Sequence, residues 1–157
     1  MTDRRALIID NRPVGAASGK STPDINPYTQ DAFATVAAAS AGDIAAAVSA
    51  ADDARAEWAA TPPSRKRAIL WGAADLLESR VEAAVALMTA ETGATGGWAG
   101  FNVALGAAML REAAAAVTRP IGEVLATDAP GALSLSVRQP AGVVAAFAPW
   151  NAPIILG

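Results

Sequence analysis

Apolar residues recur at helical spacing through the middle of this chain and at strand spacing near both of its ends. Ser40 and Asp43 form an N-cap pattern, with an acid three residues after the serine. An apolar stripe follows this cap, and charged residues lie beside it as a solvated face; the stripe comprises Ile44, Val48, Ala51, Ala54 and Trp58. The pattern predicts a first helix that begins just after Ser40.

Three further helices are predicted downstream. Thr61-Pro62-Pro63-Ser64 ends the first helix and caps a second, which carries an apolar face of Ile69, Leu70, Ala73, Leu76 and Leu77. The basic run Arg65-Lys66-Arg67 on this helix is interpreted as a solvated face. A third helix is predicted over 81–92, with Gly93 at its C′ position, and a fourth from Gly96 to about Thr118. Small residues in the fourth helix permit close helix approach, at Ala99, Gly100, Gly106, Ala107 and Ala108.

Strand patterns occur on both sides of the helices. Short apolar pieces between Leu7 and Ile25 indicate an edge strand or two with turns, and 121–125 begins a second β region. Residues 131–138 alternate with period two, as a half-exposed strand does. The apolar run 143–148, bracketed by prolines, predicts a buried strand. The fold class is therefore predicted to be α/β.

A polar side chain with useful chemistry follows the last of these strands. Asn151 lies between Pro149 and Pro153, which restrict the backbone around it. Its amide offers two N–H donors that do not titrate, and such donors stabilise charge that develops on a carbonyl oxygen. The alternative interpretation is a rigid turn in which asparagine serves turn chemistry alone.

Composition excludes several classes of site. The 157 residues contain no cysteine and no histidine, which removes thiolate nucleophiles, imidazole bases, disulfides and the usual zinc ligands. No metal-ligand spacing, Walker A loop or G-x-G-x-x-G motif occurs, so we expect no metal. A net charge of −3 with scattered basic residues argues against a nucleic-acid partner.

Two uncharged stretches approach membrane-spanning length. Residues 92–110 are rich in glycine and contain Asn102, and residues 139–157 are interrupted by prolines, so we expect neither to cross a membrane. The apolar run after Ala6 ends at Asp10, too early for a secretory leader. A cytoplasmic location is the expectation.

The run Arg138-Gln-Pro-Ala-Gly-Val-Val, followed by Pro149-Trp-Asn-Ala-Pro, resembles the R-x-P-x-G-V and P-W-N-x-P signature of the NAD(P)-dependent aldehyde dehydrogenase superfamily. Asn26-Pro-Tyr-Thr29 and Glu91-Thr-Gly93 are similar to further motifs of that family. The resemblance implies that Asn151 is the oxyanion-hole residue. It also implies that the backbone before it runs beside the nicotinamide end of NAD or NADP, at Phe147, Ala148, Pro149 and Trp150.

The segment Trp98-Ala-Gly-Phe-Asn-Val103 resembles the branch of the family that oxidises aromatic aldehydes such as salicylaldehyde, vanillin or benzaldehyde. This resemblance implies that Phe101 and Leu105 face the substrate tunnel, where an aromatic ring could stack on Phe101. Plain core packing of both side chains is the alternative, because apolar residues on a helix face usually pack in a core.

The resemblance also implies a domain organisation, that of an amino-terminal part of the family's fold with an incomplete Rossmann-like cofactor domain. Residues 1–130 would form its amino-terminal strands and helices, 131–140 an oligomerisation-type β arm, and 141–157 the first part of the parallel cofactor sheet. We expect the family's cysteine nucleophile and glutamate base to lie beyond Gly157, and the full-length enzyme to be a homo-oligomer. The competing hypothesis is a non-catalytic binding or oligomerisation module, or a partner subunit, whose β arm at 133–138 pairs with another subunit. For the strand itself, a face exposed to solvent is the alternative to an oligomer contact.

Overall fold

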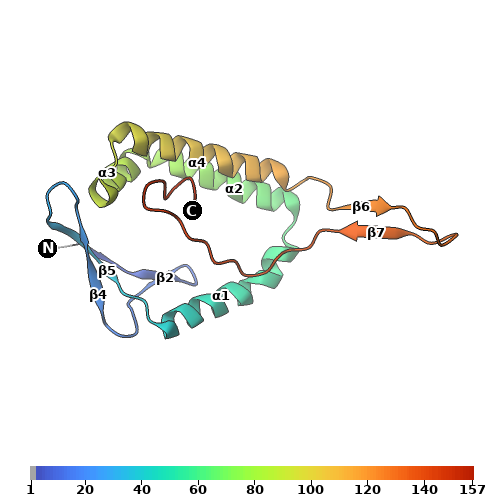
Figure 1. The fold of residues 1–157 in the computed structure, drawn as a ribbon, viewed down its shortest axis with the longest axis horizontal. Helices are drawn as coiled ribbons and strands as arrows, with labels where there is room; N and C mark the ends of the chain where they lie inside the picture. Colours follow the sequence, from blue (N-terminus) through green and yellow to red (C-terminus); the bar gives the residue numbers. More distant parts are fainter. Residues whose placement is uncertain (1–2) are drawn as a thin grey trace.

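The computed structural model describes residues 3–157, which form four helices and three small sheets (Figure 1). In the first sheet, β5 (Ala32–Ala37) is central and pairs in parallel with β1 (Asp3–Arg5) and antiparallel with β4 (Ser21–Ile25). A separate hairpin joins β2 (Leu7–Ile9) to β3 (Arg12–Val14). Its two-residue turn, Asp10 and Asn11, has φ values of 52° and 57°. The predicted α/β class is confirmed. Strands lie between Leu7 and Ile25 as expected, but there are three of them, and the sequence patterns do not indicate β1 or the central β5.

Helix α1 (Ala41–Ala60) begins where the sequence predicts. The Ser40 hydroxyl accepts from the Asp43 N–H, and the Asp43 carboxylate accepts from the Ser40 N–H at 2.8 Å, which completes a capping box. The same carboxylate accepts from the N–H of Ala17 at 3.1 Å. The cap of α1 therefore also fastens the loop after β3 to the start of the helix.

The three remaining helices pack together (Figure 1): α2 (Pro63–Ser79) lies against α4 (Gly96–Ala116), and α3 (Val81–Thr92) contacts α4 near its start. Gly93 ends α3 in the left-handed conformation at φ 72°, as its C′ position predicts. The helical core is built from small residues and two larger ones: Ala74, Met88, Ala99, Val103, Ala107 and Ala114. Their size allows the close helix approach that the sequence indicates.

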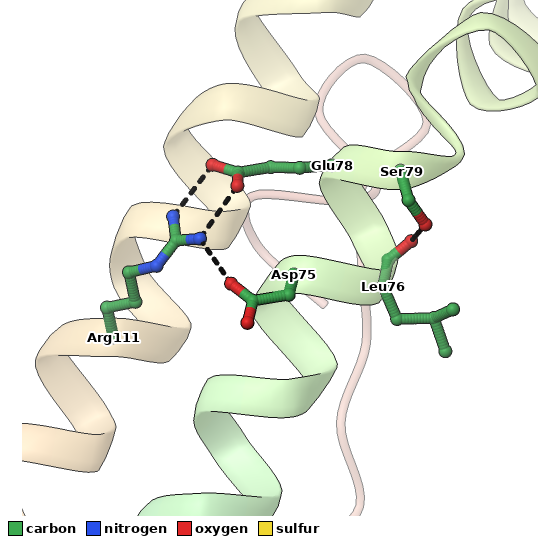
Figure 2. Close-up of polar contacts among 5 residues, drawn as sticks. All are labelled: Asp75, Leu76, Glu78, Ser79 and Arg111. Carbon is green, nitrogen blue, oxygen red and sulfur yellow. Dashed lines mark hydrogen bonds and ion pairs between the residues drawn. The ribbon is translucent and has the colours of Figure 1, made fainter.

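An ion pair crosses from α4 to α2 at the surface (Figure 2). The Arg111 guanidinium donates to both carboxylate oxygens of Glu78 and to one oxygen of Asp75, each at 2.7 Å. The hydrogen bonds from Arg111 hold the pKa of Glu78 below its ordinary value. Basic residues elsewhere on α2 also have structural partners, since the Arg67 side chain donates to the Ala114 carbonyl and to the Thr118 hydroxyl.

Strands β6 (Gly122–Leu125) and β7 (Ser134–Val137) form an antiparallel hairpin that projects away from the helices (Figure 1). Its large apolar side chains are exposed: Val124 keeps 72% of its surface, Leu135 56% and Val137 56%. Both faces of this hairpin are open within the described residues. The β prediction for 121–125 and 131–138 is confirmed, with the second strand shorter than the pattern indicates.

The predicted buried strand over 143–148 is wrong for this structure. The segment forms no strand, and Val144 and Phe147 are 73% and 91% exposed. A central strand needs neighbours on both sides, and none of the strands in residues 3–157 lies beside it. The apolar sequence of this segment is therefore not enough to make it a strand when no neighbouring strand is present.

The apolar stripe of α1 is likewise uncovered: Ile44, Val48 and Trp58 are 58%, 51% and 47% exposed. A pocket of about 360 Å³ separates part of this helix from residues 140–144, and it is lined by Trp58, Lys66 and Val144 among others. Across residues 3–157, no helix has the length and apolarity needed to span a membrane.

Candidate functional site at the junction of α4 and the Asn151 turn

Two elements form the candidate site: the first half of α4 and the turn that follows Trp150. The chain runs from β7 back past the helices (Figure 1) and ends in a turn over residues 150–155, where the Leu156 N–H donates to the Ala152 carbonyl at 3.1 Å. Ala152 is buried, with 6% of its surface exposed. The turn is therefore seated on the helical layer although the segment before it is exposed.

Trp98 joins the two elements directly. Its indole Nε1–H donates to the backbone carbonyl oxygen of Asn151 at 2.6 Å, across 53 residues of sequence. The Trp98 ring also lies over Phe101 with 5.4 Å between ring centroids and 27° between the ring planes. Through Trp98, the turn that carries Asn151 contacts the aromatic part of α4.

The Asn151 side chain is exposed and, within the described residues, its amide makes no hydrogen bond. Asn26 provides the comparison, since its carboxamide oxygen accepts from the N–H groups of Tyr28 and Thr29 at 2.9 and 3.3 Å. Asn26 thus performs turn chemistry, whereas the amide of Asn151 does not. Both N–H donors of Asn151 are available to a ligand.

Phe101 and Leu105 lie four residues apart on α4 and therefore share a face of the helix. Phe101 is 50% exposed and Leu105 is half-buried. The fully buried face of α4 is formed by other residues, including Ala99, Val103 and Ala107. The Phe101 ring therefore presents an open aromatic surface next to Trp98.

The four residues before Asn151 are open to solvent to different degrees. Phe147 and Trp150 are 91% and 75% exposed, Ala148 is exposed, and Pro149 is half-buried. Within the described residues, no hydrogen bond involves the backbone of residues 139–150. This stretch offers free amide and carbonyl groups together with two large flat side chains.

Two residues of this region make contacts that the sequence patterns do not indicate. Trp98 occupies the third position of α4, and nothing in its spacing indicates a partner near Asn151. Asn102 is fully buried and donates from Nδ2 to the Trp98 carbonyl at 3.1 Å, while its Oδ1 has no partner. A lone polar residue among the apolar positions of α4 is the only sequence signal for that contact.

The site contains no ionisable side chain: Trp98, Phe101, Leu105 and residues 147–151 are all neutral. Hydrogen-bond donation by Asn151 is therefore independent of pH. Among residues 3–157, no group of three His, Cys, Asp or Glu side chains is placed to hold a metal ion. The chemistry that the described residues can offer is neutral hydrogen-bond donation beside an aromatic surface.

A family model described as "Aldehyde dehydrogenase family" matches residues 14–157. This chain belongs to the aldehyde dehydrogenase family. It is 50% identical over 151 residues to a vanillin dehydrogenase of Pseudomonas sp. (strain HR199 / DSM 7063), covering 96% of this chain and 31% of that protein. It is 35% identical over 150 residues to a salicylaldehyde dehydrogenase of Pseudomonas sp. (strain C18), covering 96% and 31%.

Solved structures agree with this membership of the aldehyde dehydrogenase family. The fold superposes with a TM-score of 0.94 on a salicylaldehyde dehydrogenase from Pseudomonas putida G7 in complex with salicylaldehyde, at 32% identity over 98% of this chain and 32% of that one. An NAD-dependent benzaldehyde dehydrogenase from Corynebacterium glutamicum gives a TM-score of 0.75 at 35% identity, over 79% of this chain and 27% of that one. The chain spans about a third of the length of the curated relatives it matches.

Proposed function

We propose that this chain is the amino-terminal part of an NAD(P)-dependent dehydrogenase that oxidises an aromatic aldehyde to a carboxylic acid. The observation that carries the proposal is Asn151, whose two amide donors are exposed and unused beside the aromatic surface of α4. The similarity to vanillin and salicylaldehyde dehydrogenases supports an aromatic substrate.

Asn151 acts on the carbonyl oxygen of the aldehyde in this proposal. A thiolate supplied from outside residues 1–157, which contain no cysteine, attacks the carbonyl carbon and moves an electron pair onto oxygen. The amide of Asn151 donates to that oxyanion, and its neutrality keeps the donor intact at any working pH. Loss of one such donor lowers kcat by about 10²- to 10³-fold.

Residues 147–150 are the proposed contact for the nicotinamide end of NAD or NADP. The fit rests on their free backbone groups and on the exposed Phe147 and Trp150 rings, which suit a flat ring that carries a carboxamide. When bound, NAD⁺ or NADP⁺ would supply the hydride acceptor for the oxidation, and water would then hydrolyse the resulting thioester to release the carboxylic acid and the thiol. The contribution of these residues is to bind and orient the nicotinamide ring.

Phe101 and Leu105 are the proposed contacts for the substrate ring. The open face of Phe101 provides a stacking surface, and Leu105 adds an apolar flank one helical turn further along α4. Both lie on the helix that also holds the Asn151 turn through Trp98. A ring bound there would place its aldehyde group toward the turn.

We further propose that the β arm, residues 131–140, pairs with a second copy of the full-length protein, because both faces of the β6–β7 hairpin are exposed. The same proposal assigns residues 1–130 and 141–157 to the cofactor-binding domain. The cytoplasmic location stays a prediction.

The full-length protein carrying Asn151→Ala tests the proposed function. Oxidation of vanillin, salicylaldehyde and benzaldehyde is followed with NAD⁺ and with NADP⁺, and kcat should fall by about 10²- to 10³-fold in the variant. Asn26→Ala is the matched control, since it removes an asparagine amide that serves only a turn. That control should lower thermal stability and leave kcat close to that of the unsubstituted protein.

Two results would overturn the proposed function. An unsubstituted full-length protein that oxidises none of these aldehydes would favour the alternative of a non-catalytic module, whose β arm serves an interaction. An active protein whose kcat survives Asn151→Ala unchanged would remove Asn151 from the chemistry.

A further inference from the structure

We propose that Trp98 is a positioning residue that fixes the peptide of Asn151 relative to the aromatic surface of α4. The inference rests on the proposed function of Asn151, and it gives Trp98 a role that the resemblance of the segment 98–103 does not imply. Its central observation is the 2.6 Å hydrogen bond from the Trp98 indole N–H to the Asn151 carbonyl oxygen.

Trp98 is itself firmly held. Its backbone N–H donates to the Thr95 hydroxyl at 3.3 Å, which caps the start of α4. Its carbonyl accepts from Nδ2 of the fully buried Asn102, and its ring stacks against Phe101. The indole N–H is therefore presented from a fixed point on a rigid helix.

The Asn151 turn has few other restraints on its amino-terminal side. Residues 139–150 make no backbone hydrogen bond within the described structure, and most of them are exposed. On the other side, Ala152 is buried and Ile154 packs against Gly106 of α4. The Trp98 contact thus lies between the exposed residues 139–150 and the part of the turn that packs on α4.

The hydrogen bond to the carbonyl fixes the orientation of the Asn151 peptide, and with it the direction in which the Asn151 side chain leaves the backbone. An oxyanion donor works only when it lies about 2.7–3.1 Å from the developing charge. A misplacement of about 1 Å can cost on the order of 10²-fold in rate. Loss of the indole donor should therefore lower kcat for every aldehyde, including those too small to reach the aromatic surface.

A simple contact between Trp98 and the substrate ring predicts a different result. In that case the effect falls on KM, and only for aromatic aldehydes, because a short aliphatic aldehyde would not touch the ring. Comparison of kcat and KM for benzaldehyde and for propanal in one variant therefore separates a positioning role from a substrate contact.

The test uses the full-length protein with Trp98 replaced by 3-benzothienylalanine, in which a sulfur atom takes the place of the indole N–H and the ring shape is kept. We expect kcat to fall by about tenfold to a hundredfold for both aldehydes, with KM nearly unchanged. In an Asn151→Ala background the same replacement should cost little more, because the donor that it positions is already gone. Trp71, 45% exposed on α2, receives the same replacement as the control and should show unchanged kcat.

Hydrogen–deuterium exchange gives a readout that does not depend on activity. Removal of the Trp98 donor should increase exchange in a peptide covering residues 150–157 and leave a peptide from α2 unchanged. Unchanged exchange near Asn151, or a rise in KM confined to benzaldehyde, would overturn the positioning role. If the unsubstituted protein oxidises no aldehyde, the proposed function fails by itself, and the exchange result still decides whether Trp98 fixes the turn.

Discussion

Gly106 on α4 and Ile154 in the Asn151 turn pack so closely that a Cβ atom at Gly106 would lie 2.9 Å from Cγ2 of Ile154. The same Cβ would lie 3.4 Å from the Ile154 carbonyl oxygen and 3.5 Å from Cδ2 of Leu77. Glycine in the middle of a helix costs about 1 kcal/mol in helix propensity, and the close seating of the turn explains why one is present here. Together with Trp98, this contact holds the segment that carries Asn151 against α4.

Gly106→Ala should therefore displace Ile154 and loosen the turn. Overpacking of this kind costs about 1–3 kcal/mol, which a gain of about 1 kcal/mol in helix propensity offsets only in part. Thermal unfolding of the full-length protein should show a lower midpoint. Gly72→Ala on α2 is the control, since its Cβ would meet nothing within 4 Å, and its midpoint should rise or stay unchanged.

A double substitution shows whether the steric contact is the cause. Ile154→Ala removes Cγ2 of Ile154, the nearest atom that a Cβ at Gly106 would meet, so Gly106→Ala should cost less in that background than in the unsubstituted protein. Equal costs in both backgrounds would contradict the proposed packing.

Asp43 makes the stability of the folded protein depend on pH in the acid range. Hydrogen bonds from the Ser40 N–H, the Ser40 hydroxyl and the Ala17 N–H hold the pKa of Asp43 below its ordinary value of 3.8. Because the pKa is lower in the folded protein, this carboxylate stabilises the fold above its ordinary pKa. That contribution disappears as the pH falls through the lowered value.

Asp43→Asn should therefore melt at a lower temperature than the unsubstituted protein near neutral pH, and the difference should shrink as the pH falls below 3.8. Melting curves of both proteins across this pH range measure the effect. Ser40→Ala, which removes the other half of the capping box, should cost about 1 kcal/mol near neutral pH. A difference between Asp43→Asn and the unsubstituted protein that stays constant into strong acid would contradict the role of the charge.

The geometry of the Arg111 ion pair predicts that lysine cannot replace arginine at this position without loss of stability. Arg111 donates in parallel to both oxygens of Glu78 and also reaches Asp75 (Figure 2), which a lysine ammonium cannot reproduce. Arg111→Lys should lower the melting temperature although the charge is kept. The loss should be smaller at high salt, because the two acidic partners are substantially exposed.

Replacement of Glu78 by neutral glutamine isolates the contribution of its ion pair with Arg111. In a Glu78→Gln background, Arg111→Lys should lower the melting temperature by less than in the unsubstituted protein, since the two-oxygen fork is already broken. An equal loss in both backgrounds would show that the fork to Glu78 is not the source of the effect.

Two of the helical caps are predictable from sequence because their signals are local, whereas the cap expected from residues 61–64 is wrong, since α2 follows Pro62 without a side-chain cap. Ser40 and Asp43 are three residues apart, and Gly93 directly follows the helix that it ends. The period of apolar residues likewise places α1 to α4 to within a few residues. In contrast, no local pattern indicates β5, which owes its central position to partners as distant as β1.

The candidate site also has parts that the sequence indicates and parts that it does not. Resemblance to the family motifs identifies Asn151 and residues 147–150, since these lie in one short run. The Trp98 hydrogen bond is not predictable, because it joins residues 53 positions apart and depends on the path of the chain after β7. The strand expected over 143–148 fails for a related reason: its hydrophobic sequence is suited to a sheet whose other strands are not among those of residues 3–157.

The exposed apolar surface leads to a last prediction, for residues 1–157 expressed alone. Val144, Phe147 and Trp150 are 73%, 91% and 75% exposed, and the β6–β7 hairpin adds two unpaired edges. Apolar surface and open strand edges of this kind promote association, so the isolated polypeptide should self-associate and bind a hydrophobic dye. Light scattering after size exclusion measures its mass. Phe147→Ser combined with Val144→Ser should reduce dye binding, whereas a monodisperse, cooperatively melting monomer of the unsubstituted polypeptide would show that this surface is tolerated in water.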